Sequence, residues 1–242
     1  MNNNIRFELS FKNISQLEDK LNFCKLNNIK NINIPCKGLI KKELFNSTIK
    51  YISKNFNEFN VTYHYSLYHQ YSKNKKKSYQ DFLDFVKSSH TNRNYEILLV
   101  SGSNKKKNFD SIEALACLQK EKNLKVKLGI AYNPYLKKHY NISSERERFE
   151  KKFSTGLINS IWFQYGTDIK VLQNEVTYLK NVAKEEKLNL FGSLFIPSKQ
   201  FMARFKFRPW KEVYISEKCL YCLLYTSPSP RDRTRSRMPS SA

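Results

Sequence analysis

Residues Asn60–Leu67, Asn-Val-Thr-Tyr-His-Tyr-Ser-Leu, form a short apolar run of the length of a β-strand. Further runs recur at a spacing of roughly 30 residues, the length of one strand, one crossover helix and two turns. They are Ile5–Phe11, Asn31–Gly38, Tyr95–Gly102, Lys125–Pro134, Ser160–Gly166 and Leu190–Pro197. Strands that alternate with helices, without a hairpin signal between them, indicate a parallel sheet. The sequence therefore predicts an α/β fold, a TIM-type β/α barrel with seven βα units visible.

The stretches between these runs carry the apolar stripes of amphipathic helices. Leu17, Leu21 and Cys24 fall on one face of the first stretch, with polar residues opposite. Thr155-Gly156 is expected to end the fifth helix, because glycine suits the left-handed conformation at a helix C-terminus. In a β/α barrel the chemistry gathers on the loops that follow the carboxyl ends of the strands.

The last 21 residues differ in composition from the rest of the chain. Three of the seven prolines lie in 222–242, where Lys, Asn and Ile are absent. This segment resembles the translation of a transposase sequencing adapter. We therefore expect an incomplete barrel domain at 1–221, its eighth βα unit lost by truncation, and a non-native, disordered tail at 222–242. A genuine basic, Ser/Pro-rich disordered tail is the alternative.

The chain is strongly basic, with a formal net charge of +22. Such a charge raises nucleic acid as a partner. However, Lys is accompanied by many Asn, Ile, Tyr and Phe residues, a set that A/T-rich codons explain, and the basic residues are spread over most predicted helices. A nucleic-acid-binding protein therefore ranks third among the hypotheses, behind the two given below.

Cysteine usage and hydropathy indicate a reducing compartment. Cys24, Cys36 and Cys117 lie far apart in apolar contexts, so we expect them to be core thiols. No signal peptide precedes the first strand, and no apolar run approaches membrane-spanning length. We expect a cytoplasmic protein without a membrane partner.

Candidate functional residues stand at the predicted strand ends. The first strand holds Glu8 between Phe7 and Leu9, which makes it a candidate general acid or, alternatively, an outward charge that meets a Lys. The others are His64 in the third run, Gly102 and Ser103 after the fourth, Tyr132 in the fifth and Gln164 in the sixth. One acid, one His, one Gln and aromatic rings suit a pocket for a flat heteroaromatic ring. No glycine-rich nucleotide loop and no metal motif is present, so we expect no metal.

The order of these residues resembles the methylenetetrahydrofolate reductase family of flavoprotein barrels. The best stretch is Glu145–Gln164, which is similar to the family's fifth helix, its Ala-Gly turn and its Ile-Thr-Gln strand. Phe7-Glu8 resembles the Phe-Glu-Phe-Phe-Pro-Pro opening, Tyr63-His64 the Pro-His strand and Ala131-Tyr132 the Ala-Tyr-Pro strand. Gly192–Pro197 resembles the Pro-Gly-Ile-x-Pro strand. The similarity runs from about Ile5 to about Ser198.

The resemblance implies a reaction and a set of roles. The enzyme would reduce 5,10-methylenetetrahydrofolate to 5-methyltetrahydrofolate with NAD(P)H through FAD, in one-carbon metabolism. Glu8 would protonate the bridging amine of the folate, and Gln164 would hydrogen-bond the pterin. Three residues, His64, Gly102 and Tyr132, would contact the flavin, and two, Arg148 and Lys151, would hold the FAD phosphates and ribose. The expected partner is a small folate substrate, not nucleic acid, and a homo-oligomer is left open.

The sequence also departs from the family pattern. The family's Leu-Arg-Gly-Asp after the fourth strand is Val100-Ser101-Gly102-Ser103 here. The Ser103 position would lie near the substrate, and serine supplies no charge to stabilise a cationic intermediate. The alternative is therefore a non-reducing relative that binds folate or flavin, such as a folate-dependent demethylase or a regulatory protein. Loss of the Asp favours this alternative, whereas Glu8 and Gln164 favour the reductase.

Overall fold

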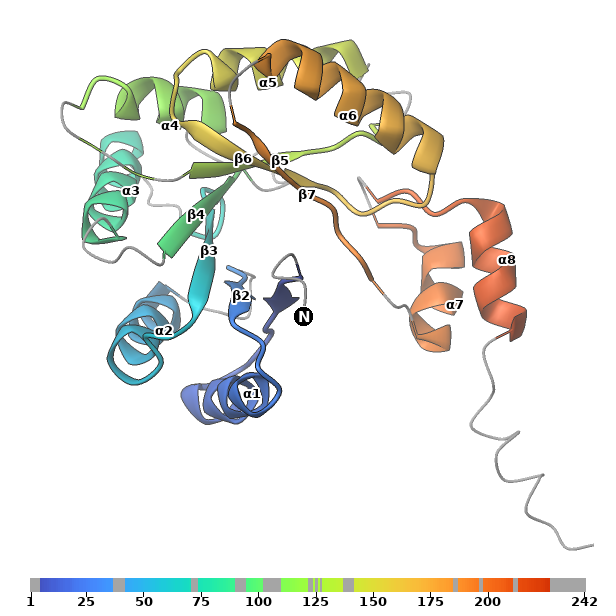
Figure 1. The fold of residues 1–242 in the computed structure, drawn as a ribbon, viewed down its shortest axis with the longest axis horizontal. Helices are drawn as coiled ribbons and strands as arrows, with labels where there is room; N and C mark the ends of the chain where they lie inside the picture. The colour runs from blue at the N-terminus through green and yellow to red at the C-terminus, as the bar shows by residue number, and fades with distance from the viewer. Residues whose placement is uncertain are drawn as a thin grey trace, which may run out of the picture. The chain divides into compact units, whose positions relative to one another are not determined.

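A computed structural model describes residues 5–36, 42–70, 74–89, 95–101, 110–121, 124, 126, 128–136, 142–184, 187–195, 198–210 and 213–226. Strands and helices alternate along the chain up to the seventh helix, which an eighth helix follows (Figure 1). The strands are β1 (Phe7–Glu8), β2 (Asn31–Ile34), β3 (Asn60–Ser66), β4 (Tyr95–Val100), β5 (Leu128–Tyr132), β6 (Ile158–Phe163) and β7 (Asn189–Phe191). The helices are α1 (Ile14–Leu26), α2 (Lys42–Asn55), α3 (Lys75–Ser89), α4 (Ser111–Leu118), α5 (Ile142–Phe153), α6 (Ile169–Ala183), α7 (Lys199–Phe207) and α8 (Glu217–Thr226).

The seven strands form one curled parallel sheet in sequential order, β1 to β7. Each apolar run expected to be a strand overlaps one of them, so the predicted α/β fold with seven βα units is confirmed. The sheet is open. Among the described residues, β1 pairs only with β2, and β7 pairs only with β6.

The outer face of the sheet is apolar because alternate strand residues point to opposite faces. Ile32 of β2 pairs in register with Val61 of β3, Tyr63 of β3 pairs with Ile97 of β4, and all four are buried. Helices α1 to α4, which belong to the same compact part of the chain as the sheet, lie on this side (Figure 1) and bury their own apolar stripes, which include Leu17 of α1 and Phe45 of α2. Each such side chain contributes about 1.5–3 kcal/mol relative to exposure in water.

Polar side chains define several helix ends. The Asn13 carboxamide oxygen accepts a hydrogen bond from the Gln16 N–H at 2.9 Å and caps α1. Asp110 and Glu113 form a reciprocal capping box at the start of α4. After α5, Gly156 adopts φ +69°, so the predicted glycine stop signal is confirmed.

The chain divides into two compact units. The first unit comprises 1–132, 146–162 and 185–191, and the second comprises 133–145, 163–184 and 192–242. Helix α8 crosses position 221/222, where the sequence analysis places the start of a foreign tail, and 227–242 lie outside the described residues.

The described residues bear on two further expectations, which concern the cysteines and membrane-spanning helices. Cys24 and Cys36 are buried thiols, as predicted, and Cys117 is half-buried. No described helix combines the length and the apolar character that crossing a membrane requires.

Candidate functional site

The inner face of the sheet in the first unit is polar, in contrast to its outer face. Glu8 pairs in register with Asn33, Asn33 with Thr62, and Thr62 with Glu96. Partners in register lie on the same face, so these side chains line one surface of four neighbouring strands. Polar groups on a sheet interior require hydrogen-bond partners, and the structure provides them from one side chain to the next.

Arg6 joins three strands at the start of the sheet. Its Nε donates to Asn33 Oδ1 at 2.9 Å, and its Nη2 donates to the Ile32 carbonyl at 3.0 Å and to the Asn60 carbonyl at 2.9 Å. Burial lowers the pKa of Arg6, and the negative charge of Glu96 opposes this shift. Because arginine stays protonated in proteins, the group remains a cation on the inner face.

Glu96 on β4 connects β3 to β6. Its carboxylate accepts a hydrogen bond from Thr62 Oγ1 at 3.3 Å and a short one from Ser160 Oγ. The Ser160 hydroxyl in turn accepts the indole N–H of Trp162 at 3.0 Å. A chain of donors therefore runs from Trp162 through Ser160 to Glu96 and fixes the edge of the indole. We call Arg6, Asn33, Thr62, Glu96, Ser160 and Trp162 the inner-face network.

Trp162 is the largest ring in this network. Its indole stacks on Phe191 of β7, with ring centroids 4.3 Å apart and an interplanar angle of 19°. The Arg6 guanidinium lies 5.8 Å from the indole centroid, and the His64 ring meets it at 6.3 Å and 65°. Gly129 of β5 makes space for the indole, since a Cβ at this position would lie 2.6 Å from both Ser160 Oγ and Trp162 Nε1. The packing of Trp162 against β5 therefore depends on a glycine at position 129.

Two predicted site residues lie on the same face as the network. Glu8 is the last residue of β1 and is exposed, so its carboxylate is accessible to a small molecule. His64 lies one inward-facing position beyond Thr62 toward the carboxyl end of β3 and is half-buried beside Trp162. The exposed Glu8 carboxylate is therefore a group that could deliver a proton to a bound ligand.

Tyr132 is placed differently from what a cofactor contact requires. Register puts β5 residues Leu128 and Ile130 with the outer-face residues of β4, and Tyr132 follows the same alternation. Its side chain is 1% exposed, and its ring meets the Phe149 ring of α5 edge-on at 6.0 Å and 88°. The phenol side chain therefore belongs to the packing between β5 and α5.

The two predicted phosphate-holding cations lie one helical turn apart on α5. Arg148 Nη1 donates to Asp110 Oδ2 at 3.2 Å, whereas Lys151 is exposed. Burial acts to raise the pKa of Asp110, but hydrogen bonds from the Glu113 and Ile112 N–H groups and the Arg148 charge outweigh it, and the pKa is lowered. Asp110 is thus an ionised cap of α4 that already occupies Arg148.

The remaining predicted residues lie elsewhere. Gln164 follows β6 immediately, belongs to the second unit, and its Oε1 accepts the Tyr165 N–H at 3.2 Å. Gly102 and Ser103 lie outside the described residues. Within the described ranges, no three His, Cys, Asp or Glu side chains gather as a metal site would require.

A flavin dinucleotide fits the described residues in part. Arg148 and Lys151 stand at i and i+3 and present cations suited to phosphate oxygens. His64 offers an imidazole on the inner face. Tyr132 does not fit, because its ring is enclosed by protein. Arg148 fits if a phosphate takes the place of the Asp110 carboxylate as its hydrogen-bond partner, or if the guanidinium binds both groups.

The inner-face network is not among the predicted site residues. Those residues stand at or near the carboxyl ends of the strands, whereas Arg6, Glu96 and Ser160 lie nearer the amino ends. The signal was nevertheless present in the strict alternation of Asn31-Ile32-Asn33-Ile34, which marks a strand with one polar face inside an α/β fold.

No protein-family model matches the sequence, and a search of curated proteins finds no match either.

Proposed function

We propose that this protein is a flavin-dependent oxidoreductase of the methylenetetrahydrofolate reductase type, built on a TIM-like sheet. The observation that carries the proposal is the register of β1 to β4. It places the exposed Glu8 carboxylate on the same face as His64, and the Trp162 indole lies against His64 on that face. An accessible acid on the same face of the sheet as flat aromatic rings suits a pterin-like ligand.

The family resemblance supplies the roles that we propose for the chain's own residues. Glu8 donates a proton to the bridging amine of 5,10-methylenetetrahydrofolate, which opens the five-membered ring. The chemistry that FAD would supply here, when bound, is hydride transfer after its reduction by NADH or NADPH. Lys151, and Arg148 if it exchanges Asp110 for a phosphate, would hold the FAD phosphates by charge-assisted hydrogen bonds, and His64 would contact the flavin.

An absorption spectrum of the purified protein mixed with FAD tests the proposal. After removal of unbound FAD, we expect a retained flavin spectrum that NADH or NADPH bleaches and methylenetetrahydrofolate restores. Glu8→Gln should abolish the restoration by folate and leave flavin retention unchanged, because the acid acts on the folate. Glu18→Gln, an exposed acid on α1, is the matched control. Full restoration by Glu8→Gln protein would remove Glu8 from the mechanism.

One observation favours the non-reducing relative as a second candidate. Two expected flavin contacts are engaged within the protein, since Tyr132 packs against Phe149 and Arg148 is paired with Asp110. A barrel relative that binds folate alone needs neither residue. Retention of tetrahydrofolate, measured by calorimetry, together with no retained FAD would support this candidate and exclude the reductase.

A further inference from the structure

Helix α7 of the second unit is followed by a sharp return of the chain. The Ser198 hydroxyl caps its start by accepting the Phe201 N–H at 3.2 Å. The helix ends at Phe207 with Arg208 as its C-cap, and Pro209 cannot continue it. Trp210 then folds back, so that its indole meets the Phe201 ring edge-on, with centroids 4.7 Å apart and an angle of 81°.

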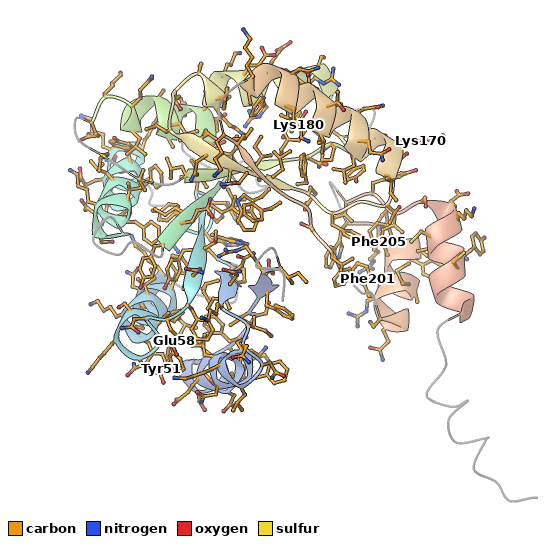
Figure 2. All side chains as sticks on the ribbon, viewed as in Figure 1. Tyr51, Glu58, Lys170, Lys180, Phe201 and Phe205 are labelled. Atoms are coloured by element: carbon orange, nitrogen blue, oxygen red, sulfur yellow. The ribbon has the colours of Figure 1, made fainter. Side chains whose placement is uncertain are left out.

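The return creates a small aromatic pocket on α7. Phe201 and Phe205 stand one turn apart on the same side of the helix (Figure 2), with ring centroids 5.9 Å apart. Trp210 is 58% exposed and forms an outer wall. The pocket measures about 190 Å³ and is lined by Ser198, Gln200, Phe201, Arg204, Phe205 and Trp210. This volume suits a single ring with one substituent rather than a dinucleotide.

The polar side of the pocket is cationic. Gln200 and Arg204 are one turn apart and both exposed, and neither side chain forms a hydrogen bond or ion pair with the part of the chain that the structure describes. Positive charge dominates residues 187–216, in which Glu212 is the one acidic residue. The basic residues of this range are Lys187, Lys199, Arg204, Lys206, Arg208 and Lys211. An anion at this position would gain a guanidinium partner that no carboxylate of the described chain occupies.

We propose that this pocket binds a small aromatic anion, a single ring that carries a phosphate or carboxylate. The ring packs against Phe201 and Trp210 in the edge-to-face or offset manner that aromatic groups prefer. The acid group accepts hydrogen bonds from the Arg204 guanidinium and the Gln200 amide. The proposal goes beyond the flavin-dependent function and does not depend on it, because every lining residue belongs to α7 and its flanks.

Calorimetric titration of the full chain with phenyl phosphate tests the pocket. We expect saturable binding, and at least tenfold weaker binding of phenol or inorganic phosphate, because each supplies only one of the two contacts. Arg204→Gln should weaken phenyl phosphate binding at least tenfold. The matched control is Arg208→Gln, since Arg208 is an exposed arginine four residues further on that does not line the pocket.

Tryptophan emission localises the bound ring. The chain has two tryptophans, Trp162 and Trp210. Phenyl phosphate should change the emission of the wild-type protein but not that of Trp210→Phe. This substitution retains an aromatic ring as the outer wall of the pocket. Two results would overturn the proposal: equal affinity for phenyl phosphate and inorganic phosphate, or equal losses in Arg204→Gln and Arg208→Gln. Either result would reduce the site to diffuse attraction of anions by a basic surface.

Discussion

The outer face of the sheet in the first unit buries Ile32, Val61 and Ile97, whereas its inner face carries Arg6, Thr62 and Glu96. The outer face is held by close packing against helices. The individual apolar contacts are weak and have no preferred direction, but together they contribute a large stabilisation. The inner face is held by hydrogen bonds of fixed direction, such as those that Glu96 accepts from Thr62 and Ser160. Sequence pattern alone therefore specifies the outer face, whereas the inner face depends on individual residues.

The largest expected effect is on the outer face. Ile97→Ala should lower the free energy of unfolding by about 2–5 kcal/mol, because it leaves a cavity at a residue with no exposed surface. Denaturant unfolding measures it. Leu26→Ala, at a side chain that is 83% exposed, is the matched control and should change the free energy by less than about 0.5 kcal/mol. Equal effects would mean that the packing of the outer face is misassigned.

The inner-face network should respond to loss of one charge. Glu96→Gln keeps the size of the side chain but weakens two charge-assisted hydrogen bonds, from Thr62 and Ser160, at a cost of about 1.5–3 kcal/mol. Emission from Trp162 should change with it, because its N–H is bonded through Ser160. Glu147→Gln, an exposed acid on α5, serves as control. Unchanged stability and emission would show that the network does not hold the indole.

Steric crowding on β5 offers a sharper test of the same face. Gly129→Ala introduces a methyl group 2.6 Å from Ser160 Oγ and Trp162 Nε1, which must move apart. We expect a loss of about 1–3 kcal/mol in unfolding free energy. Gly192→Ala is the control, because a Cβ at Gly192 meets nothing within 4 Å. A neutral Gly129→Ala would contradict the placement of the indole against β5.

The smallest effect concerns the cap of α4. Because the folded-state pKa of Asp110 is lowered, its contribution is fully present above the unfolded-state pKa and disappears as pH falls through the folded value. Asp110→Ala should cost about 1 kcal/mol at neutral pH, and the difference from wild type should shrink toward pH 2. Asp110→Asn, which keeps an acceptor at the cap, should lose less. A difference that grows with acid would have the wrong sign.

The extent of sequence prediction follows the same division. All seven strands could be predicted, because the buried residues of the outer face make each strand visible in the sequence as an apolar run. Tyr132 shows the limit, since a strand-end tyrosine can point to either face and only the register of β5 places it under α5. Arg6 shows another limit: it precedes β1, and its partners on β2 and β3 are 26 to 54 residues away. Long-range hydrogen bonds of this kind have no local pattern.

The open sheet ends in two very short strands, two residues in β1 and three in β7. An exposed strand edge is a template on which another chain can add a strand, and its danger grows with its length. Here each of the two edge strands is so short that it offers only a few unpaired backbone groups. The protein can therefore carry a sheet that is not closed on itself with little tendency to recruit further copies into edge-to-edge aggregates.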